Sequence, residues 1–303
     1  MSAKHLKLIA LALAGLLLLW GGSELLSRGS DSVTGSSLLP ALAAKDVDTI
    51  TIVKGVDTIV LARRDSTQWS VNGHRAATDV IGELLVALRD TARPELVAQE
   101  AASFARLGVD SAGGRWLRVR RGGQPPLELI LGARGPDYQS AYARRPGDSR
   151  VYLWRGRLAG VMDRTADGWR DRRIAALPTD SIAALEVARG KDRYTLARVR
   201  GSWTLNGGRT DSAGVARYLD RLKFITASGF AGPAAPDSVK ARATRRLSVR
   251  GAHGVLLTLA FDSMASGYLV HHLGGVGGEG ATAYLMNFWD VDGVTPASRS
   301  LKK

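Results

Sequence analysis

The sequence contains no cysteine among its 303 residues. Disulfide bonds, thiolate metal sites, iron–sulfur clusters and cysteine nucleophiles are therefore excluded. Acidic residues are fewer than basic residues: the sequence has 28 Asp and Glu against 42 Lys and Arg, which gives a formal net charge of +14. Such a charge favours an anionic membrane surface, an acidic partner or a nucleic acid. With 45% hydrophobic and 23% charged residues, the composition is that of a globular protein with a real core.

Motifs for catalysis or metal binding are also missing. There is no G-x-S-x-G nucleophile elbow, and the neighbours His271 and His272, with His253, lack the spacing of metal ligands. The glycine-rich run at 274–280 lacks the Lys-Ser/Thr of a P-loop, so we interpret it as a flexible hairpin tip. The acidic candidates are interpreted as loop residues: Asp137 beside Tyr138, and Asp290 with Asp292. We therefore predict a non-enzymatic protein with no catalytic, cofactor-binding or metal-binding residues and no cofactor.

An apolar run from Leu8 to Trp20 follows Lys4 and Lys7 at the N-terminus. Its 13 residues span only about 20 Å as a helix, but the segment from Leu6 to Leu26 reaches about 31 Å, enough to cross the hydrocarbon core. The lysines before the run place the N-terminus in the cytoplasm. We predict a transmembrane signal anchor at residues 1–26, with the rest of the chain outside the cytoplasm.

A cleaved signal peptide is the alternative interpretation of this segment, because the apolar run has the right length for one. The small residues Gly21, Gly22 and Ser23 provide a weak cleavage site. Both interpretations export the body of the protein. Ser27–Ala44 is rich in Ser and Gly and contains Pro40, so we predict a flexible linker at residues 27–44.

An internal repeat organises the remaining sequence. Residues 48–73 (DTITIVKGVDTIVLARRDSTQWSVNG) resemble residues 180–207 (DSIAALEVARGKDRYTLARVRGSWTLNG), with most offsets between 132 and 135 residues. Alternating apolar residues predict strands in each copy. Each copy also has an Asn-Gly turn, at Asn72-Gly73 and Asn206-Gly207. We expect Trp69 and Trp203, at equivalent places in the two copies, to be core residues.

A helix and further strands follow in each copy. The apolar stripes begin at Val80 and at Val215, after capping residues at 78–79 and 210–211. The predicted fold class is α+β: an N-terminal transmembrane helix and two tandem related modules of mainly antiparallel sheet, each with a packed helix. After the anchor and linker, the predicted domains are a first module at 45–178, a second at 179–290, and a polar tail at 291–303.

The order of several short motifs resembles the bacterial domain-of-unknown-function 4340 family. After the apolar segment and Leu-Pro linker, the motifs are DVDTITI, a W-x-V strand, FARLGVD (Phe104–Asp110), an LxLG strand end (Leu129–Gly132), RVYLW (Arg150–Trp154) and WRDRR (Trp169–Arg173). The resemblance extends from about Leu39 to Phe230. It implies a single-pass envelope protein, often associated with ABC transporter subunits of the gliding-motility auxiliary type. It implies no catalytic residues.

The expected function follows from these features. We expect a membrane-anchored protein of the bacterial inner membrane, with its body in the periplasm or another extracytoplasmic space. It would bind another envelope component, with ABC transporter subunits as candidates. A cleaved, soluble exported protein that binds a small anionic ligand or a polysaccharide is the alternative. We expect no nucleic-acid partner, because the arginines occur in scattered pairs and no recognition motif is present.

Overall fold

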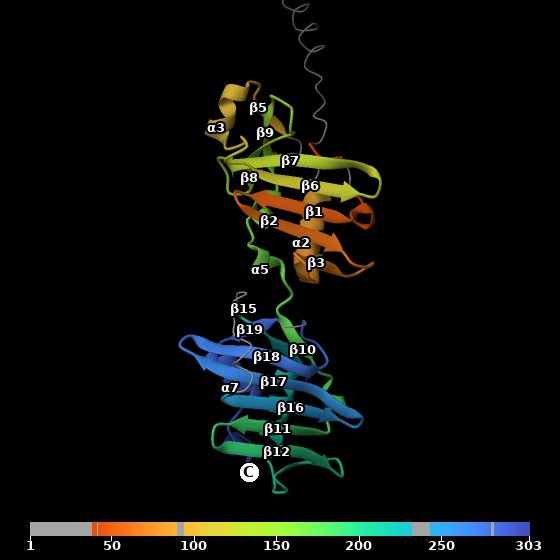
Figure 1. Ribbon diagram of the computed structural model, residues 1–303, viewed down its shortest axis with the longest axis vertical. Coiled ribbons are helices and arrows are strands. Elements are labelled where there is room, and N and C mark those ends of the chain that lie inside the picture. Colours follow the sequence, from red (N-terminus) through yellow and green to blue (C-terminus); the bar gives the residue numbers. More distant parts are fainter. Residues whose placement is uncertain (1–37, 41, 90–93, 232–242, 280–281) are drawn as a thin grey trace, which may run out of the picture. The chain divides into compact units, whose positions relative to one another are not determined.

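The computed structural model describes residues 38–40, 42–89, 94–231, 243–279 and 282–303. These residues form mainly antiparallel sheets with a few helices, as expected for an α+β protein (Figure 1). In the part of the chain so described, no helix is both long and apolar enough to cross a membrane. The predicted membrane helix at 1–26 lies outside the described residues.

The chain divides into two compact units. One holds the described residues up to Thr67 together with Asp79–Arg164, and the other holds Gln68–Thr78 and Thr165–Lys303. The elements of the first are η1 (Ala44–Asp46), β1 (Thr49–Lys54), β2 (Asp57–Arg63), α2 (Thr78–Arg89), β5 (Glu95–Ala98), η2 (Ala101–Ser103), α3 (Phe104–Leu107), β6 (Arg115–Arg121), β7 (Gln124–Arg134), β8 (Ser140–Arg144), β9 (Val151–Arg155) and α4 (Leu158–Met162).

The second unit begins with a short hairpin and continues after residue 164. Its elements are β3 (Trp69–Val71), β4 (His74–Arg75), α5 (Ala166–Trp169), β10 (Arg173–Ala176), η3 (Thr179–Ser181), β11 (Ala184–Arg189), β12 (Asp192–Val199), β13 (Ser202–Leu205), α6 (Ser212–Leu222), β14 (Phe224–Thr226), β15 (Gly229–Phe230), β16 (Arg245–Gly251), β17 (Gly254–Met264), β18 (Gly267–Gly275), β19 (Ala283–Met286), α7 (Phe288–Val294) and η5 (Ser298–Leu301).

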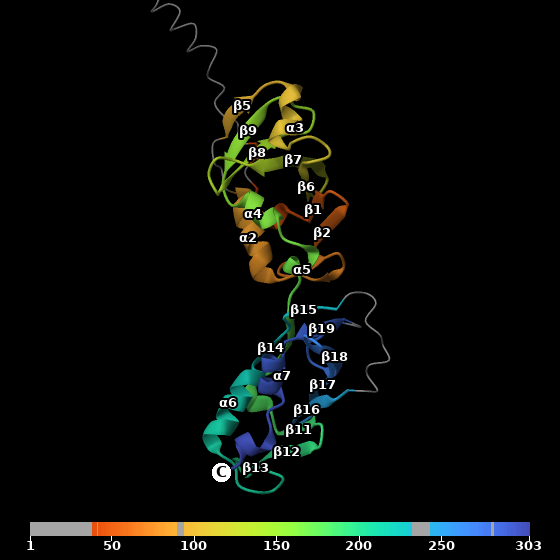
Figure 2. The ribbon, with the colours of Figure 1, turned by 90° about the vertical axis from the view of Figure 1, so that its left-hand side faces the viewer.

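The strand order of the two large sheets supports the predicted duplication. The first sheet runs β4-β3-β2-β1-β6-β7-β8-β9-β5, and the second runs β13-β12-β11-β16-β17-β18-β19-β15. Apart from β4, each strand of the first sheet has a counterpart at the same place in the second. Figure 2 shows α2 and α4 on one face of the first sheet, and α6 and α7 on one face of the second. The residue ranges predicted for the two modules stay predictions.

The repeat also extends further toward the C-terminus than its sequence signal. An antiparallel bridge joins Ala76 to Arg170, and an equivalent bridge joins Thr210 to Lys302. Residues 291–303, predicted as a polar tail, therefore contain the counterparts of α4 and α5. Val291, Val294 and Leu301 are buried in the core of the second unit, with 0%, 5% and 2% exposure. Because only a few apolar residues of this segment pack into the core, its polar composition does not predict that packing.

The Asn-Gly turns and the alternating strands predicted from the repeat are present in the structure. Asn72 and Asn206 have φ values of 48° and 49°, and each is followed by a glycine that also has positive φ. Side chains with a local polar group tolerate this left-handed conformation best, so the Asn-Gly turn predictions are confirmed. The buried residues Ile50 and Ile52 of β1 lie opposite Val119 and Leu117 of β6, which places one apolar face of the sheet in the core.

A buried arginine bound to an aspartate recurs in both units. In the first, Arg115 pairs with Asp163 and donates to the carbonyl oxygen of Gly132 at 2.8 Å. In the second, Arg245 pairs with Asp292, which also lies 3.2 Å from Arg189. In the first copy the pair joins β6 to the residue that follows α4, and in the second it joins β16 to α7. Because the two copies share this link, we interpret the pair as structural.

Candidate functional site

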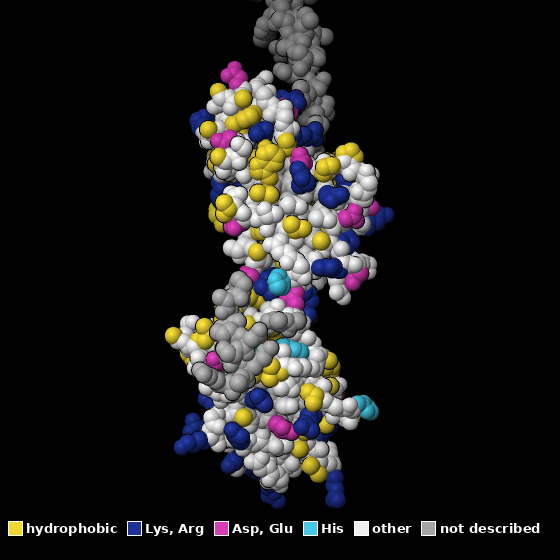
Figure 3. Space-filling view, in the orientation of Figure 1, with side chains coloured by type: hydrophobic (Ala, Val, Ile, Leu, Met, Phe, Trp, Pro, Cys, Tyr) yellow, Lys and Arg dark blue, Asp and Glu magenta, His cyan; other side chains and the backbone are white. Residues whose placement is uncertain are grey.

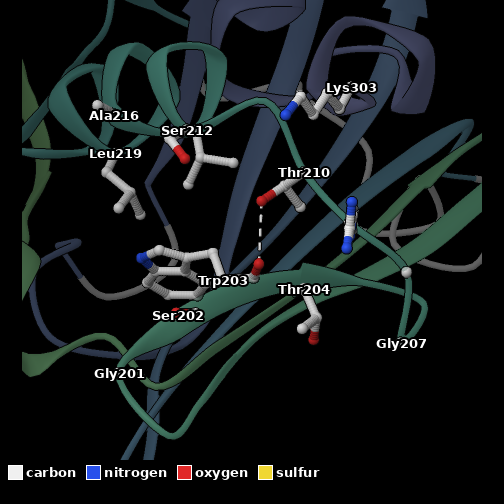
Figure 4. A pocket seen from close by; sticks show the side chains of 13 residues that line it. Gly201, Ser202, Trp203, Thr204, Gly207, Thr210, Ser212, Ala216, Leu219 and Lys303 are labelled. Atoms are coloured by element: carbon white, nitrogen blue, oxygen red, sulfur yellow. Dashed lines mark hydrogen bonds between the residues drawn. The ribbon is translucent and has the colours of Figure 1, made fainter.

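A cavity of about 570 Å³ lies in the second unit, between strand β13 and helix α6 (Figure 4). This volume is within the range of small-molecule binding sites. Its lining consists of Gly201, Ser202, Trp203, Thr204, Gly207, Gly208, Arg209, Thr210, Ser212, Val215, Ala216, Leu219 and Lys303. The lining combines hydroxyl groups, one indole, aliphatic side chains and two cations.

Local backbone geometry builds the two walls of this cavity. Strand β13 lies between two tight turns, one with Arg200 and Gly201 at positive φ and the other at Asn206-Gly207. The Asn206 side chain accepts a hydrogen bond from the Thr195 amide at 2.8 Å, which fixes the second turn. On the opposite wall, Asp211 caps α6 by accepting from the Ala213 and Gly214 amides, both at 3.1 Å.

The Thr210 hydroxyl connects the two walls, because it donates to the carbonyl oxygen of Trp203 at 2.9 Å. Figure 4 shows the indole of Trp203 beneath α6, with Ser212 and Leu219 on the helix side. In the same view, the side chain of Lys303 extends toward Ser212 and Thr210.

The cavity is positively charged. None of the lining residues is acidic, and neither Arg209 nor Lys303 forms an ion pair or side-chain hydrogen bond with any residue that the structure describes. Arg198 is the cross-strand partner of Trp203, so its side chain is on the same face of the sheet. The nearest carboxylate on α6, that of Asp211, is occupied by capping the helix and by Arg217 at 3.9 Å.

The equivalent place in the first repeat is electrically balanced. The two matching bridges align Arg75 with Arg209 and Asp171 with Lys303. Arg75 Nε lies 3.0 Å from an Asp171 carboxylate oxygen, and its backbone amide donates to Glu279. The second repeat therefore has two cations where the first repeat has an arginine–aspartate pair.

The two tryptophans at equivalent places also differ. Trp69 has 5% exposure and is a core residue, as predicted. Trp203 is only half-buried: part of it packs against the core of the second unit, and part lines the cavity. The prediction of a core role is confirmed for Trp69 and is incomplete for Trp203.

The histidines singled out in the sequence do not gather at this cavity. His271 is buried on β18, whereas its neighbour His272 points to the other face and has Nε2 3.1 Å from the carbonyl oxygen of Val276. His253 lies at the exposed turn between β16 and β17. Among the residues that the structure describes, no group of three His, Cys, Asp or Glu side chains could hold a metal ion.

The glycine-rich run packs against a neighbouring strand. The Gly278 amide donates to the carbonyl oxygen of Ile174 at 2.7 Å. A side chain at Gly277 would approach that same oxygen to 2.3 Å, so the close approach explains the glycine. Gly274 and Gly275 end β18, which pairs antiparallel with β19, so the run lies in a hairpin connection as predicted, with Gly277 and Gly278 packed against β10.

The acidic candidates are engaged by neighbouring side chains. Asp137 lies 3.5 Å from Arg155, and the exposed Tyr138 ring lies beneath Arg134 at 5.0 Å. Asp290 accepts from Asn287 at 3.3 Å, and Asp292 is bound by arginines as described above. In the view of Figure 3, Lys and Arg side chains are spread over each unit rather than gathered in one patch.

Sequence reasoning did not single out Arg209 and Lys303. The two structural bridges extend the repeat to residue 303 and set these cations against Arg75 and Asp171. The predicted repeat ended at residue 290, so the pair was not compared.

The fold and the cavity together define a two-sheet α+β protein with a cavity lined by one tryptophan and two cations. The chain belongs to the family described as "Domain of unknown function (DUF4340)", whose model matches residues 69–246. This match confirms the resemblance found in the sequence motifs. No curated protein and no solved structure matches the chain.

Proposed function

We propose that this chain is a non-enzymatic, membrane-anchored protein of the bacterial cell envelope, and that its second unit binds an anionic group of another envelope component in the cavity at Trp203. The observation that carries the proposal is the pair of unpartnered cations, Arg209 and Lys303, where the first repeat has an internal ion pair. Both cations are exposed, and unpaired cations that line one hollow are favourable places for an anionic ligand.

The lining supports binding rather than catalysis. It contains neither a histidine nor a carboxylate, so no lining residue can serve as an ordinary general acid or base near neutral pH. The polar groups present are hydroxyls and cations, which hold and orient a ligand.

The location is supported by the sequence. The apolar segment from Leu6 to Leu26 and the lysines before it support an anchor in the inner membrane, crossing once with its N-terminus in the cytoplasm. The body would then lie in the periplasm or another extracytoplasmic space, where ABC transporter subunits are candidate partners through the family resemblance. A mature chain starting near Ser23, identified by N-terminal sequencing, would favour the cleaved, soluble alternative.

Anion binding can be tested on the detergent-extracted full chain. Inorganic phosphate and sulfate are titrated while tryptophan fluorescence is followed, because Trp203 lines the cavity. The wild type should give a saturable change. The R209A/K303A variant should bind at least about 10-fold more weakly, since each charge-assisted hydrogen bond contributes about 1.5–3 kcal/mol.

The matched control is the R299A/K302A variant, which removes two exposed cations from the same end of the chain without touching the cavity lining. It should bind like the wild type. Equal weakening in the two variants would show a diffuse effect of net charge, and the absence of any saturable response would remove the proposed site.

A further inference from the structure

We infer that the ligand of the Trp203 cavity is a saccharide with an acidic substituent, whose ring stacks on the indole while its carboxylate or phosphate lies at Arg209 and Lys303. This inference rests on the proposed function, because it specifies the class of the anionic ligand. Three further features of the cavity support it: the exposed part of the indole, the unbonded Ser212 hydroxyl and the aliphatic wall opposite.

The indole is the only aromatic ring in the lining of this cavity. A tryptophan side chain that is only half-buried offers a large, rigid apolar surface with little loss of conformational entropy on binding. The flat face of the indole fits the C–H-rich face of a pyranose ring. Trp69, in the first repeat, has no such surface, because it is almost fully buried.

Two hydroxyl groups lie on the same side of the cavity as the indole. That of Thr210 bonds to the carbonyl oxygen of Trp203 at 2.9 Å. The exposed hydroxyl of Ser212, at the start of α6, forms no hydrogen bond with any described residue. It can both donate and accept, so it can bond a sugar hydroxyl without a change of protonation. Ser202 and Thr204 alternate with Trp203 along β13, so their side chains lie on the other face of that strand (Figure 4).

The wall that faces the indole is aliphatic. It is formed by Val215, Ala216 and Leu219 of α6, with Ser212 at the start of the helix (Figure 4). A glucose-type pyranose ring presents C–H groups on its two faces and hydroxyls around its rim, which matches one apolar wall, one aromatic wall and the Ser212 hydroxyl at the edge.

The test compares five probes on the full chain: glucuronic acid, glucose 6-phosphate, glucose, inorganic phosphate and adenosine monophosphate. We expect the two acidic sugars to bind at least 10-fold more tightly than glucose or inorganic phosphate. The variant Trp203→Leu should weaken the acidic sugars by 10-fold or more and leave phosphate affinity unchanged, whereas R209A/K303A should weaken both acidic sugars and phosphate. Affinities are measured by calorimetry, so that loss of a fluorophore does not affect the readout.

Trp289→Leu is the control, since Trp289 is 79% exposed on α7 and lies outside the cavity lining. It should leave all affinities unchanged. Trp203→Tyr keeps an aromatic face and should retain most of the sugar affinity. Its result keeps the inference testable if the leucine variant fails to fold.

The outcomes separate the two proposals. If phosphate binds but acidic sugars bind no better, or if Trp203→Leu changes both equally, the saccharide inference is wrong and the anion site stands. If adenosine monophosphate binds more tightly than glucose 6-phosphate, the ligand class is a nucleotide and the inference is also overturned. If no anion binds, both proposals fail.

Discussion

Replacing Asp292 by alanine tests the structural interpretation of the arginine–aspartate pair. The Arg245 side chain is 12% exposed and the Asp292 side chain 46%, so the pair is buried on one side only. Breaking a fully buried pair costs about 3–5 kcal/mol, and breaking an exposed pair costs about 0–1 kcal/mol. Arg245 keeps two contacts, Thr295 Oγ1 at 3.1 Å and the Tyr268 ring at 4.8 Å. We therefore expect Asp292→Ala to lower the free energy of unfolding by about 2 kcal/mol.

The assay is urea denaturation of the detergent-extracted full chain. The readout is hydrogen exchange of the backbone amides of strands β11 and β16. These strands pair with each other in the second unit, so they report on that unit alone. Asp220→Ala is the matched control, because Asp220 is 68% exposed and bonds only to Lys223 on the surface. It should leave the urea midpoint nearly unchanged, because a solvent-exposed ion pair contributes little to stability.

The double variant Asp292→Ala with Arg245→Met separates charge burial from packing. If the cost arises from an uncompensated guanidinium, replacing that group by an apolar side chain should recover part of the lost stability. Equal costs for Asp292→Ala and Asp220→Ala would contradict the reasoning. So would a double variant whose cost is the sum of the two single costs.

Two further predictions concern packing and pH. A side chain at Gly132 would lie 2.3 Å from the Leu107 carbonyl oxygen, so Gly132→Ala should lower stability by about 3 kcal/mol. Gly82 lies in the middle of α2 with open space around it, so Gly82→Ala should raise stability by about 1 kcal/mol. Thermal unfolding compares the two variants, and equal shifts would rule out the steric explanation. Burial raises the pKa of Tyr218, whose hydroxyl donates to the Val294 carbonyl oxygen at 3.1 Å. Above about pH 10 the unfolded chain releases this proton and the folded chain keeps it, so stability should fall by up to about 1.4 kcal/mol per pH unit. Urea midpoints at pH 9 and 11 should show a smaller decline in Tyr218→Phe, and identical declines in both proteins would refute the assignment.

Much of the fold could be predicted because it depends on local chemistry repeated twice. The Asn-Gly turns need positive φ, and alternating residues such as Ile50 and Ile52 need one buried face, so both features are visible in the sequence. The packing of residues 291–303 could not be read in this way. Val291, Val294 and Leu301 are three apolar residues in a polar stretch, and their burial depends on the tyrosines and strands that receive them.

The candidate site was harder to predict than the fold, because it depends on which charges lack a partner. Arg209 and Arg75 are indistinguishable as residue types, and only the structure shows that Asp171 faces one of them. Trp203 and Trp69 occupy the same place in the repeat, yet their exposure differs because the chain around them differs. A sequence records the residue types but not these pairings.

The order of strands in the first sheet has a mechanical consequence. Strand β1 is the first strand of the described residues and yet lies inside the sheet, in antiparallel register with β2 on one side and β6 on the other from Thr49 to Lys54. A force applied along the chain at Val47 therefore loads both ladders in shear, and every backbone hydrogen bond to both neighbours resists it at once. An edge strand at this position would be held by one ladder instead of two, so the interior position of β1 suits it to carry tension.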